Sequence, residues 1–182
     1  MAHEDHELVA KVVANNDTAA FGELIRRHQS QVRNFLRKLA GDITLADDLA
    51  QDCFLHAFNK LSTYSGRGSF PGWLLKVAYT TFLQSKRRSK RYAEILDAAG
   101  HMADSQGKSY THPNEDLNDL EKLLAVLDEQ ERAVMIMSYS CGFSHREISE
   151  ATAMPVGTIK SLIHRSKEKI RSDFAIKDHQ HG

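Results

Sequence analysis

The residues with the clearest chemical potential form a basic segment near the C-terminus, residues 160–171. Its lysines and arginines could neutralise phosphates, and those that reach a groove could donate hydrogen bonds to base edges. Ile159, Leu162 and Ile163 have the spacing of one face of a helix. We therefore predict a helix that packs through its apolar side and contacts DNA through the other side, with Thr158, Lys160, Ser161, His164, Arg165 and Lys167.

The segment before this helix predicts the element that positions it. Ser144 and Glu147 have the spacing of a capping box, which begins a helix. The small residues 151–153 suit the end of that helix, and Pro155 suits the first turn of the next one. Two short helices joined by a tight turn, the second one basic, are typical of a helix-turn-helix motif, whose second helix enters the DNA major groove. Ser144 is therefore a further DNA-contacting candidate.

A second surface combines aromatic and cationic side chains. Residues 62–72 contain three glycines and one proline and are predicted to form a loop, followed by a helix from Trp73 into a basic cluster at 86–91. Aromatic rings can stack on unpaired bases while cations follow the strand, and each stacked base contributes roughly 1–3 kcal/mol. The residues predicted to bind single-stranded nucleic acid here are Tyr64, Arg67, Lys76, Lys86, Arg87 and Arg88.

The aromatic residues of this surface also fit a structural explanation, in which Phe70 and Trp73 belong to the core. We expect that explanation to hold for Trp73, which is in phase with Val77. We expect Tyr64, in the glycine-rich loop, to be exposed.

A third surface is the polar face of a helix predicted over residues 44–60, with Thr44 as its cap. Its apolar side chains recur every four residues at Leu45, Leu49, Cys53, Ala57 and Leu61. The opposite face carries Asp48, Gln51, Asp52, Leu55 and Asn59. An acidic face is usually just hydrated, but an exposed leucine among acids indicates a protein partner.

Composition limits the classes of function. The 24 Lys and Arg balance 24 Asp and Glu, which excludes a uniformly basic coat, and the charges occur in blocks that suggest separate surfaces for separate partners. There is neither a signal-peptide pattern nor an apolar run of about 20 residues, so we expect a cytoplasmic protein without membrane insertion. Cys53 and His56 could form half of a metal site, but no second pair has ligand spacing, and we expect a packed thiol, no metal and no cofactor.

The helical periodicities predict an all-α chain of two small domains joined by a flexible linker. Asp17 is the predicted cap of a helix that Gly41 ends, and Asp128 with Glu131 forms another capping box. Residues 97–114 lack periodicity. We place an N-terminal domain at 1–94, the linker at 95–113, a four-helix domain containing the helix-turn-helix at 114–177 and a tail at 178–182.

Four segments resemble the bacterial RNA polymerase sigma factors of the small, two-domain extracytoplasmic-function (ECF) group: residues 47–54 with 57–58, residues 70–74, residues 86–91, and residues 157–165 after 147–149. The resemblance covers about residues 5–92 and 114–175. It implies a promoter-specificity subunit that is not an enzyme, takes no small-molecule substrate and is held inactive by an anti-sigma factor.

The resemblance also implies roles for the three surfaces. Asp48, Gln51, Asp52 and Leu55 match the region that binds the clamp of the polymerase largest subunit. The 62–91 segment matches the part that opens the −10 element and captures it as a single strand, which adds Thr80 to its candidates. The helix-turn-helix matches the reader of the −35 duplex.

Two positions depart from the family pattern. Tyr79 and Thr80 stand where arginine and asparagine are frequent, and a threonine lacks the paired donor and acceptor of an amide. Leu162 stands where an arginine is frequent, so one DNA contact is expected to be missing.

Two other classes of function fit parts of the sequence. A stand-alone helix-turn-helix regulator would bind duplex DNA without polymerase, usually as a symmetric dimer. A metal hydrolase could use some of the 10 histidines, but neither a His-Glu-x-x-His nor a Cys-x-x-Cys pattern is present.

Overall fold

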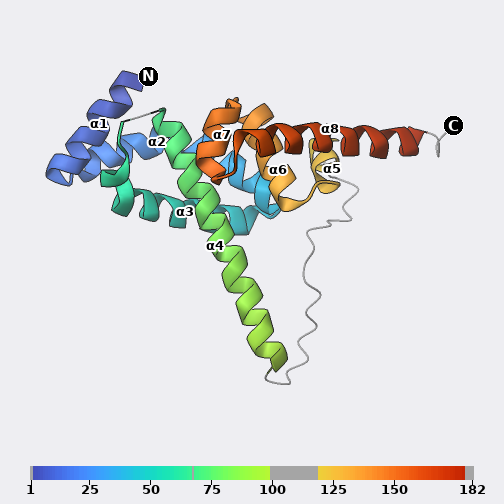
Figure 1. The fold of residues 1–182 in the computed structure, drawn as a ribbon. Helices are drawn as coiled ribbons and strands as arrows, with labels where there is room; N and C mark the ends of the chain where they lie inside the picture. The colour runs from blue at the N-terminus through green and yellow to red at the C-terminus, as the bar shows by residue number, and fades with distance from the viewer. Residues whose placement is uncertain (1, 67, 99–118, 179–182) are drawn as a thin grey trace. The chain divides into compact units, whose positions relative to one another are not determined.

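The computed structural model describes residues 2–66, 68–98 and 119–178, with side chains for residues 4–66, 68–98 and 122–173. The chain forms two compact units, residues 1–109 and 110–182 (Figure 1). All regular structure in the described ranges is helical, as predicted, and the boundary between the units falls within the predicted linker.

In its described residues the N-terminal unit has four α-helices and a short 3₁₀ turn: α1 (Ala2–Asn15), α2 (Thr18–Ala40), α3 (Ile43–Lys60), η1 (Leu61–Thr63) and α4 (Phe70–Ala98). Helices α2, α3 and α4 pack against one another, and α1 packs on α2. Phe35, Leu36, Leu75 and Phe82 are at most 1% exposed at the centre. Each such buried side chain contributes about 1.5–3 kcal/mol, so this core is the main support of the unit.

The helix caps of this unit follow the sequence with one exception. Asp17 Oδ1 accepts the Ala20 N–H at 3.0 Å and begins α2, which ends at Gly41 with φ 69°. Thr44 was expected to cap α3, but Asp42 does so, because its extended backbone lets its carboxylate accept the Leu45 N–H at 2.7 Å. Thr44 therefore lies inside the first turn.

Helix α4 is longer at both ends than predicted. It begins at Phe70 rather than Trp73, because Ser69 Oγ accepts the Gly72 N–H at 3.2 Å and Pro71 fits the first turn. It continues to Ala98, so residues 95–98 are helical rather than linker, and residues 99–113 lie outside the described ranges. Its last buried side chain is Phe82, and the rest of α4 extends past the other helices of its unit (Figure 1).

The described part of the C-terminal unit has the four helices predicted for it: α5 (Asp119–Ala125), α6 (Glu129–Met135) with a π-helical turn η2 (Ile136–Ser140), α7 (His145–Thr152) and α8 (Val156–Asp178). Helix α8 packs against α6 and α7. Val134, Met137, Ile148 and Ile159 are fully buried between them. The capping box of Asp128 and Glu131 is confirmed at the start of α6.

Three further properties bear on function. Cys53 and Cys141 are free thiols, and burial raises the pKa of Cys53 to about 12, so this thiol stays protonated at neutral pH. Among the described residues, no three His, Cys, Asp or Glu side chains are arranged to hold a metal ion. None of the described helices has both the length and the apolar character needed to cross a bilayer.

Candidate nucleic-acid and protein interfaces

Helix α8 separates its apolar and basic side chains as the sequence predicts. Ile159, Leu162 and Ile163 are 0%, 4% and 7% exposed and seat the helix in its unit. The predicted DNA-contacting side chains are all exposed: Thr158, Lys160, Ser161, His164, Arg165 and Lys167. Leu162 lies in the core, as its place on the apolar side predicts, so this side chain offers no contact to DNA.

Some of the exposed side chains of α8 already contact other side chains of the protein, and others do not. His164 Nε2 lies 3.4 Å from a Glu168 carboxylate oxygen, and Lys167 Nζ lies 5.3 Å from the centre of the Tyr139 ring. Within the part of the chain that the structure describes, Lys160 and Arg165 make neither an ion pair nor a side-chain hydrogen bond. These two cations are therefore the ones most available to a phosphate or a base edge.

The start of α7 and the turn between α7 and α8 follow the predicted pattern except at Pro155. Ser144 Oγ accepts the Glu147 N–H at 3.3 Å and donates to Glu147 Oε2 at 2.8 Å, so this hydroxyl is already used by the cap. Ala153 is left-handed with φ 58° and ends α7. Pro155 precedes α8 instead of standing in its first turn, and its carbonyl accepts the Ile159 N–H at 3.1 Å.

An ion pair that the sequence did not suggest also holds α8. Lys169 Nζ donates to both carboxylate oxygens of Glu131 at 2.7 Å, and Glu131 is only 2% exposed. The same carboxylate accepts the Asp128 N–H at 3.1 Å. Glu131 therefore both completes the capping box of α6 and pairs with Lys169 of α8. The only sequence signal was the capping-box position of Glu131, 38 residues before its partner.

In the N-terminal unit, the expectation that Tyr64 is exposed is wrong. Its side chain is 9% exposed and packs near Phe70 and Trp73, with ring centres 5.6 and 5.8 Å away. Its hydroxyl donates to the Gly68 carbonyl at 3.1 Å, which turns the tyrosine inward. Trp73, expected in the core, is half-buried, and Arg67 lies outside the described residues.

Helix α1 fastens this aromatic loop through a group of polar contacts that we call the α1 clasp: Asp5, His6, His28 and Tyr64. Because Tyr64 uses its hydrogen on Gly68, its oxygen accepts from His6 Nε2 at 2.7 Å. His28 Nε2 lies 3.0 Å from Asp5 Oδ2, and Asp5 is 4% exposed. Burial, and then the charge of Asp5, raise the pKa of Tyr64. Sequence reasoning missed the clasp, because its partners lie 58 and 23 residues apart.

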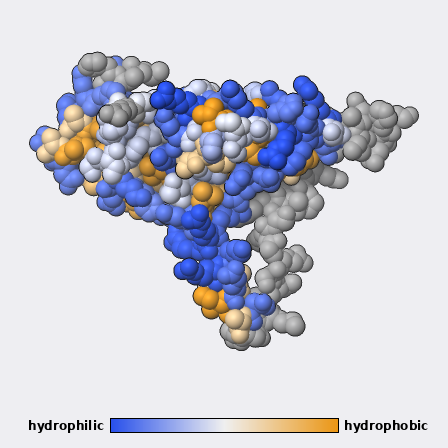
Figure 2. Space-filling view, viewed as in Figure 1, coloured by the Kyte–Doolittle hydropathy of each residue, from blue (hydrophilic) through white to orange (hydrophobic). Residues whose placement is uncertain are grey.

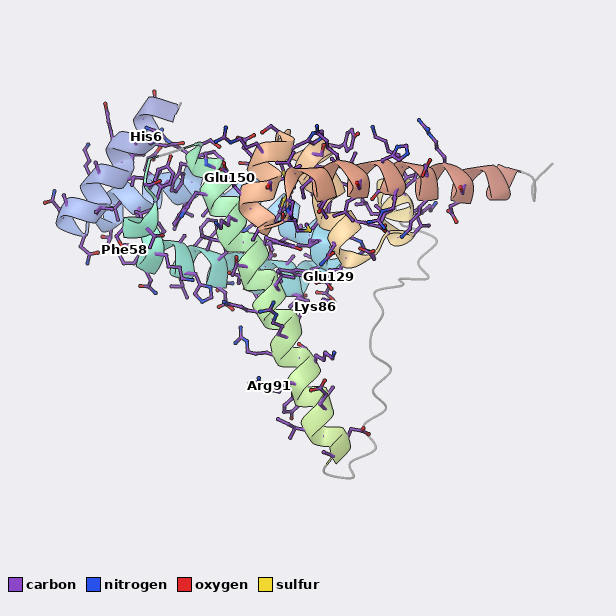
Figure 3. All side chains as sticks on the ribbon, in the orientation of Figure 1. His6, Phe58, Lys86, Arg91, Glu129 and Glu150 are labelled. Atoms are coloured by element: carbon purple, nitrogen blue, oxygen red, sulfur yellow. The ribbon has the colours of Figure 1, made fainter. Side chains whose placement is uncertain are left out.

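The remaining predicted single-strand contacts lie along α4. Lys76, Arg87 and Arg88 are exposed, and Lys86, partly exposed, lies 5.7 Å from the centre of the Phe82 ring. Thr80 donates to the Lys76 carbonyl at 2.9 Å, so its hydroxyl hydrogen is engaged within the helix. Figure 3 shows Lys86 and Arg91 on the length of α4 beyond its buried part. In Figure 2 the surface of α4 is hydrophilic there and carries an apolar patch near its end, where Ile95 is 58% exposed.

The acidic face of α3 is exposed as predicted. Asp48 and Gln51 are exposed, Asp52 is partly exposed, and Leu55 is 64% exposed. The neighbouring Asp47 behaves differently, since Arg37 Nη2 lies 3.3 Å from its carboxylate. Within the described residues Asp48 and Asp52 have no such cation, so their charge is available to a partner.

Comparison with known families identifies both units. Residues 24–92 match the family model "Sigma-70 region 2", and residues 117–170 match "Sigma-70, region 4". These two segments contain the acidic face of α3, the buried part and basic cluster of α4, and the basic face of α8.

Several individual proteins similar to the chain are ECF RNA polymerase sigma factors. The chain is 30% identical over 142 residues to the ECF RNA polymerase sigma factor EcfG of Rhodopseudomonas palustris, covering 76% of each chain. It is 26% identical to the ECF RNA polymerase sigma factor SigW of Bacillus subtilis, covering 90% of this chain and 94% of that one. It is 29% identical to the ECF RNA polymerase sigma factor SigE of Mycolicibacterium smegmatis, covering 89% of this chain but 65% of that one.

A solved structure has a similar fold. The sigma factor RpoE from Bartonella quintana, in complex with the anti-sigma factor NepR, superposes with a TM-score of 0.67 and 26% identity. The superposition covers 84% of this chain and 94% of that one.

Proposed function

Because the chain belongs to the ECF group of RNA polymerase sigma factors, we propose that it is a promoter-specificity subunit of bacterial RNA polymerase. One observation carries the proposal: the two matched regions fall in different compact units, and each has its own exposed basic helix surface. In this proposal the chain works in the cytoplasm and contributes no catalytic group, since the polymerase performs the chemistry.

The acidic face of α3 is the proposed polymerase contact. Asp48, Gln51, Asp52 and Leu55 would bind the clamp of the largest subunit. The carboxylates of Asp48 and Asp52 have no cationic partner among the described residues, so they can attract a basic partner surface. The exposed Leu55 side chain leaves apolar area in water that a partner would cover.

The two basic helices are the proposed promoter contacts. In the C-terminal unit α8 would lie in the major groove of the −35 element, with Lys160 and Arg165 as the proposed contacts because both are exposed and neither has a partner among the described residues. In the N-terminal unit α4 would hold the melted −10 strand through Lys76, Lys86, Arg87 and Arg88. Trp73, rather than Tyr64, is the aromatic side chain proposed to meet a base.

An anti-sigma factor is the proposed regulator. RpoE from Bartonella quintana is bound to the anti-sigma factor NepR in the solved structure, and the same fold extends over most of this chain. We propose that a protein of this kind covers the polymerase- or DNA-binding surfaces until it is released.

Polymerase binding tests the proposed function. Asp48→Arg reverses the charge of an exposed side chain in the proposed contact, so the affinity for core polymerase should fall about tenfold or more while the helical content stays the same. The measurement is binding of the labelled full-length chain to purified core enzyme.

Asp97→Arg is the matched control, because it makes the same charge change on an exposed position of α4 outside the proposed contact. Its affinity should stay within about twofold of the unsubstituted chain. Equal affinities of the two variants for core polymerase would show that the acidic face of α3 is not the contact. If the unsubstituted chain does not bind core polymerase, the proposed function itself is refuted.

A further inference from the structure

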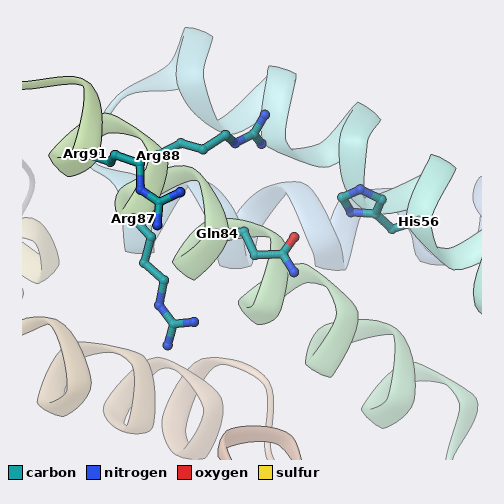
Figure 4. A pocket seen from close by; sticks show the side chains of 5 residues that line it. All are labelled: His56, Gln84, Arg87, Arg88 and Arg91. Atoms are coloured by element: carbon teal, nitrogen blue, oxygen red, sulfur yellow. The ribbon is translucent and has the colours of Figure 1, made fainter. Parts of the chain in front are cut away.

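A pocket of about 440 Å³ lies between α3 and α4 (Figure 4). His56 of α3 lines it together with four side chains of α4: Gln84, Arg87, Arg88 and Arg91. The proposed function uses Arg87 and Arg88 as parts of a basic surface, but it gives no role to a pocket, to His56, to Gln84 or to Arg91.

The register of α4 explains why these side chains meet. Gln84, Arg88 and Arg91 follow Thr81 at intervals of three, four and three residues, which keeps them on one side of the helix. Thr81 Oγ1 lies 3.1 Å from His56 Nδ1, which turns this side of α4 toward α3. Gln84, Arg88 and Arg91 therefore lie on the side of α4 that faces His56 of α3, although they come after the last buried residue of α4.

The pocket has uncompensated positive charge. Within the described residues Arg87, Arg88 and Arg91 have no ion pair, although Lys90 on the same turn lies 4.0 Å from Glu94. Among the described residues that line the pocket there is no carboxylate. Guanidinium groups bind phosphate oxygens through paired N–H donors, so an anion of this shape would relieve their mutual repulsion.

The neutral side chains add hydrogen-bonding groups. Thr81 donates its hydroxyl hydrogen to the Val77 carbonyl at 2.9 Å, so its oxygen accepts from His56 Nδ1. The other ring nitrogen, Nε2, has no partner within the described residues and remains for a ligand. In a protonated ring Nε2 donates to a phosphate oxygen, and the Gln84 amide supplies two further donors.

We propose that this pocket, formed by His56, Gln84, Arg87, Arg88 and Arg91, binds a single phosphate group. The phosphate belongs either to the backbone of the promoter strand that α4 holds or to a free phosphate compound. Only the first source rests on the proposed function, and both share the same chemistry.

Two arms of one experiment separate the sources, using the full-length chain without polymerase. In the first, inorganic phosphate is titrated while the side-chain signals of arginine and histidine are followed by NMR. In the second, single-stranded oligonucleotides carry one uncharged methylphosphonate at successive positions, and their affinities are compared.

The variants are Arg91→Gln and Lys90→Gln, adjacent substitutions that each remove one positive charge. Arg91 lines the pocket and Lys90 does not. At 0.15 M salt, where exposed charges are screened beyond about 8 Å, Arg91→Gln should weaken phosphate or oligonucleotide binding about tenfold and Lys90→Gln less than about twofold.

A backbone phosphate is indicated if one methylphosphonate position weakens binding to the unsubstituted chain about tenfold and has no further effect in Arg91→Gln. A free phosphate is indicated if inorganic phosphate gives saturable shifts that Arg91→Gln abolishes. Equal effects of the two variants, or no response in either arm, would overturn the proposal. Both arms are independent of polymerase, so loss of polymerase binding affects only the proposed function.

Discussion

Helices α4 and α8 both combine an apolar side with a basic surface, but they arrange the two differently. In α8 the buried residues Ile159 and Ile163 alternate with the exposed cations Lys160 and Arg165 over the same turns. In α4 burial ends at Phe82, and the basic cluster at 86–91 follows it along the axis. Helix α8 is therefore packed against its unit along the same turns that carry its cations, whereas α4 carries its cations after its last buried residue.

The difference corresponds to two kinds of nucleic-acid contact. Reading base edges in a groove requires side chains at fixed depth and angle, which a helix seated along its length provides. Following a flexible strand requires cations along a path, which the extended part of α4 provides. Substitutions in each unit can show whether the two helices depend on their units in these two ways.

The largest effect should come from removing a buried side chain that packs α8 into its unit. Ile159→Ala empties a fully buried position and should destabilise the C-terminal unit by about 2–5 kcal/mol. Trp73, the single tryptophan, lies in the N-terminal unit. The thermal unfolding midpoint measured by its fluorescence should therefore stay unchanged, while the unfolding transition measured by circular dichroism should broaden toward lower temperature.

Thr158→Ala is the control for this change, since Thr158 is the exposed neighbour of Ile159 and its loss should shift stability by less than about 0.5 kcal/mol. If Ile159→Ala lowers the midpoint measured by Trp73 fluorescence as much as the midpoint measured by circular dichroism, the two units unfold together. The proposed difference between α4 and α8 would then be contradicted.

A smaller effect should follow from Tyr64→Phe. The ring and its packing stay, but the hydrogen bonds to Gly68 and His6 are lost, which should cost the N-terminal unit about 1 kcal/mol. Urea unfolding followed by Trp73 fluorescence measures this cost. Single-strand affinity should remain within about twofold, and a large loss of affinity at unchanged stability would show that the hydroxyl contacts DNA.

Local rules predicted the frame of both units. Capping boxes at Asp128 and Ser144 mark helix starts because they use amides within the same turn, and periodicity identified the buried face of α8. Thr44 was the predicted cap of α3, but Asp42 caps it, because backbone geometry decides which side chain reaches the free amide.

The errors come from contacts between residues far apart in the chain. Three glycines suggested an exposed loop around Tyr64, but His6 of α1 and Phe70 of α4 fold the side chain inward. The Glu131–Lys169 ion pair likewise depends on the packing of α6 against α8. The pocket at His56 depends on the approach of α3 to α4, which periodicity within each helix does not contain.

The most direct test of the division between the two helices compares Arg165→Gln with Arg88→Gln in complex with core polymerase. Affinities are measured for a duplex carrying a matched −35 element and for a single strand carrying the −10 element. Arg165→Gln should weaken duplex binding about tenfold and leave strand binding within about twofold, and Arg88→Gln should do the reverse. If both variants weaken both ligands equally, the two basic helices do not have separate tasks.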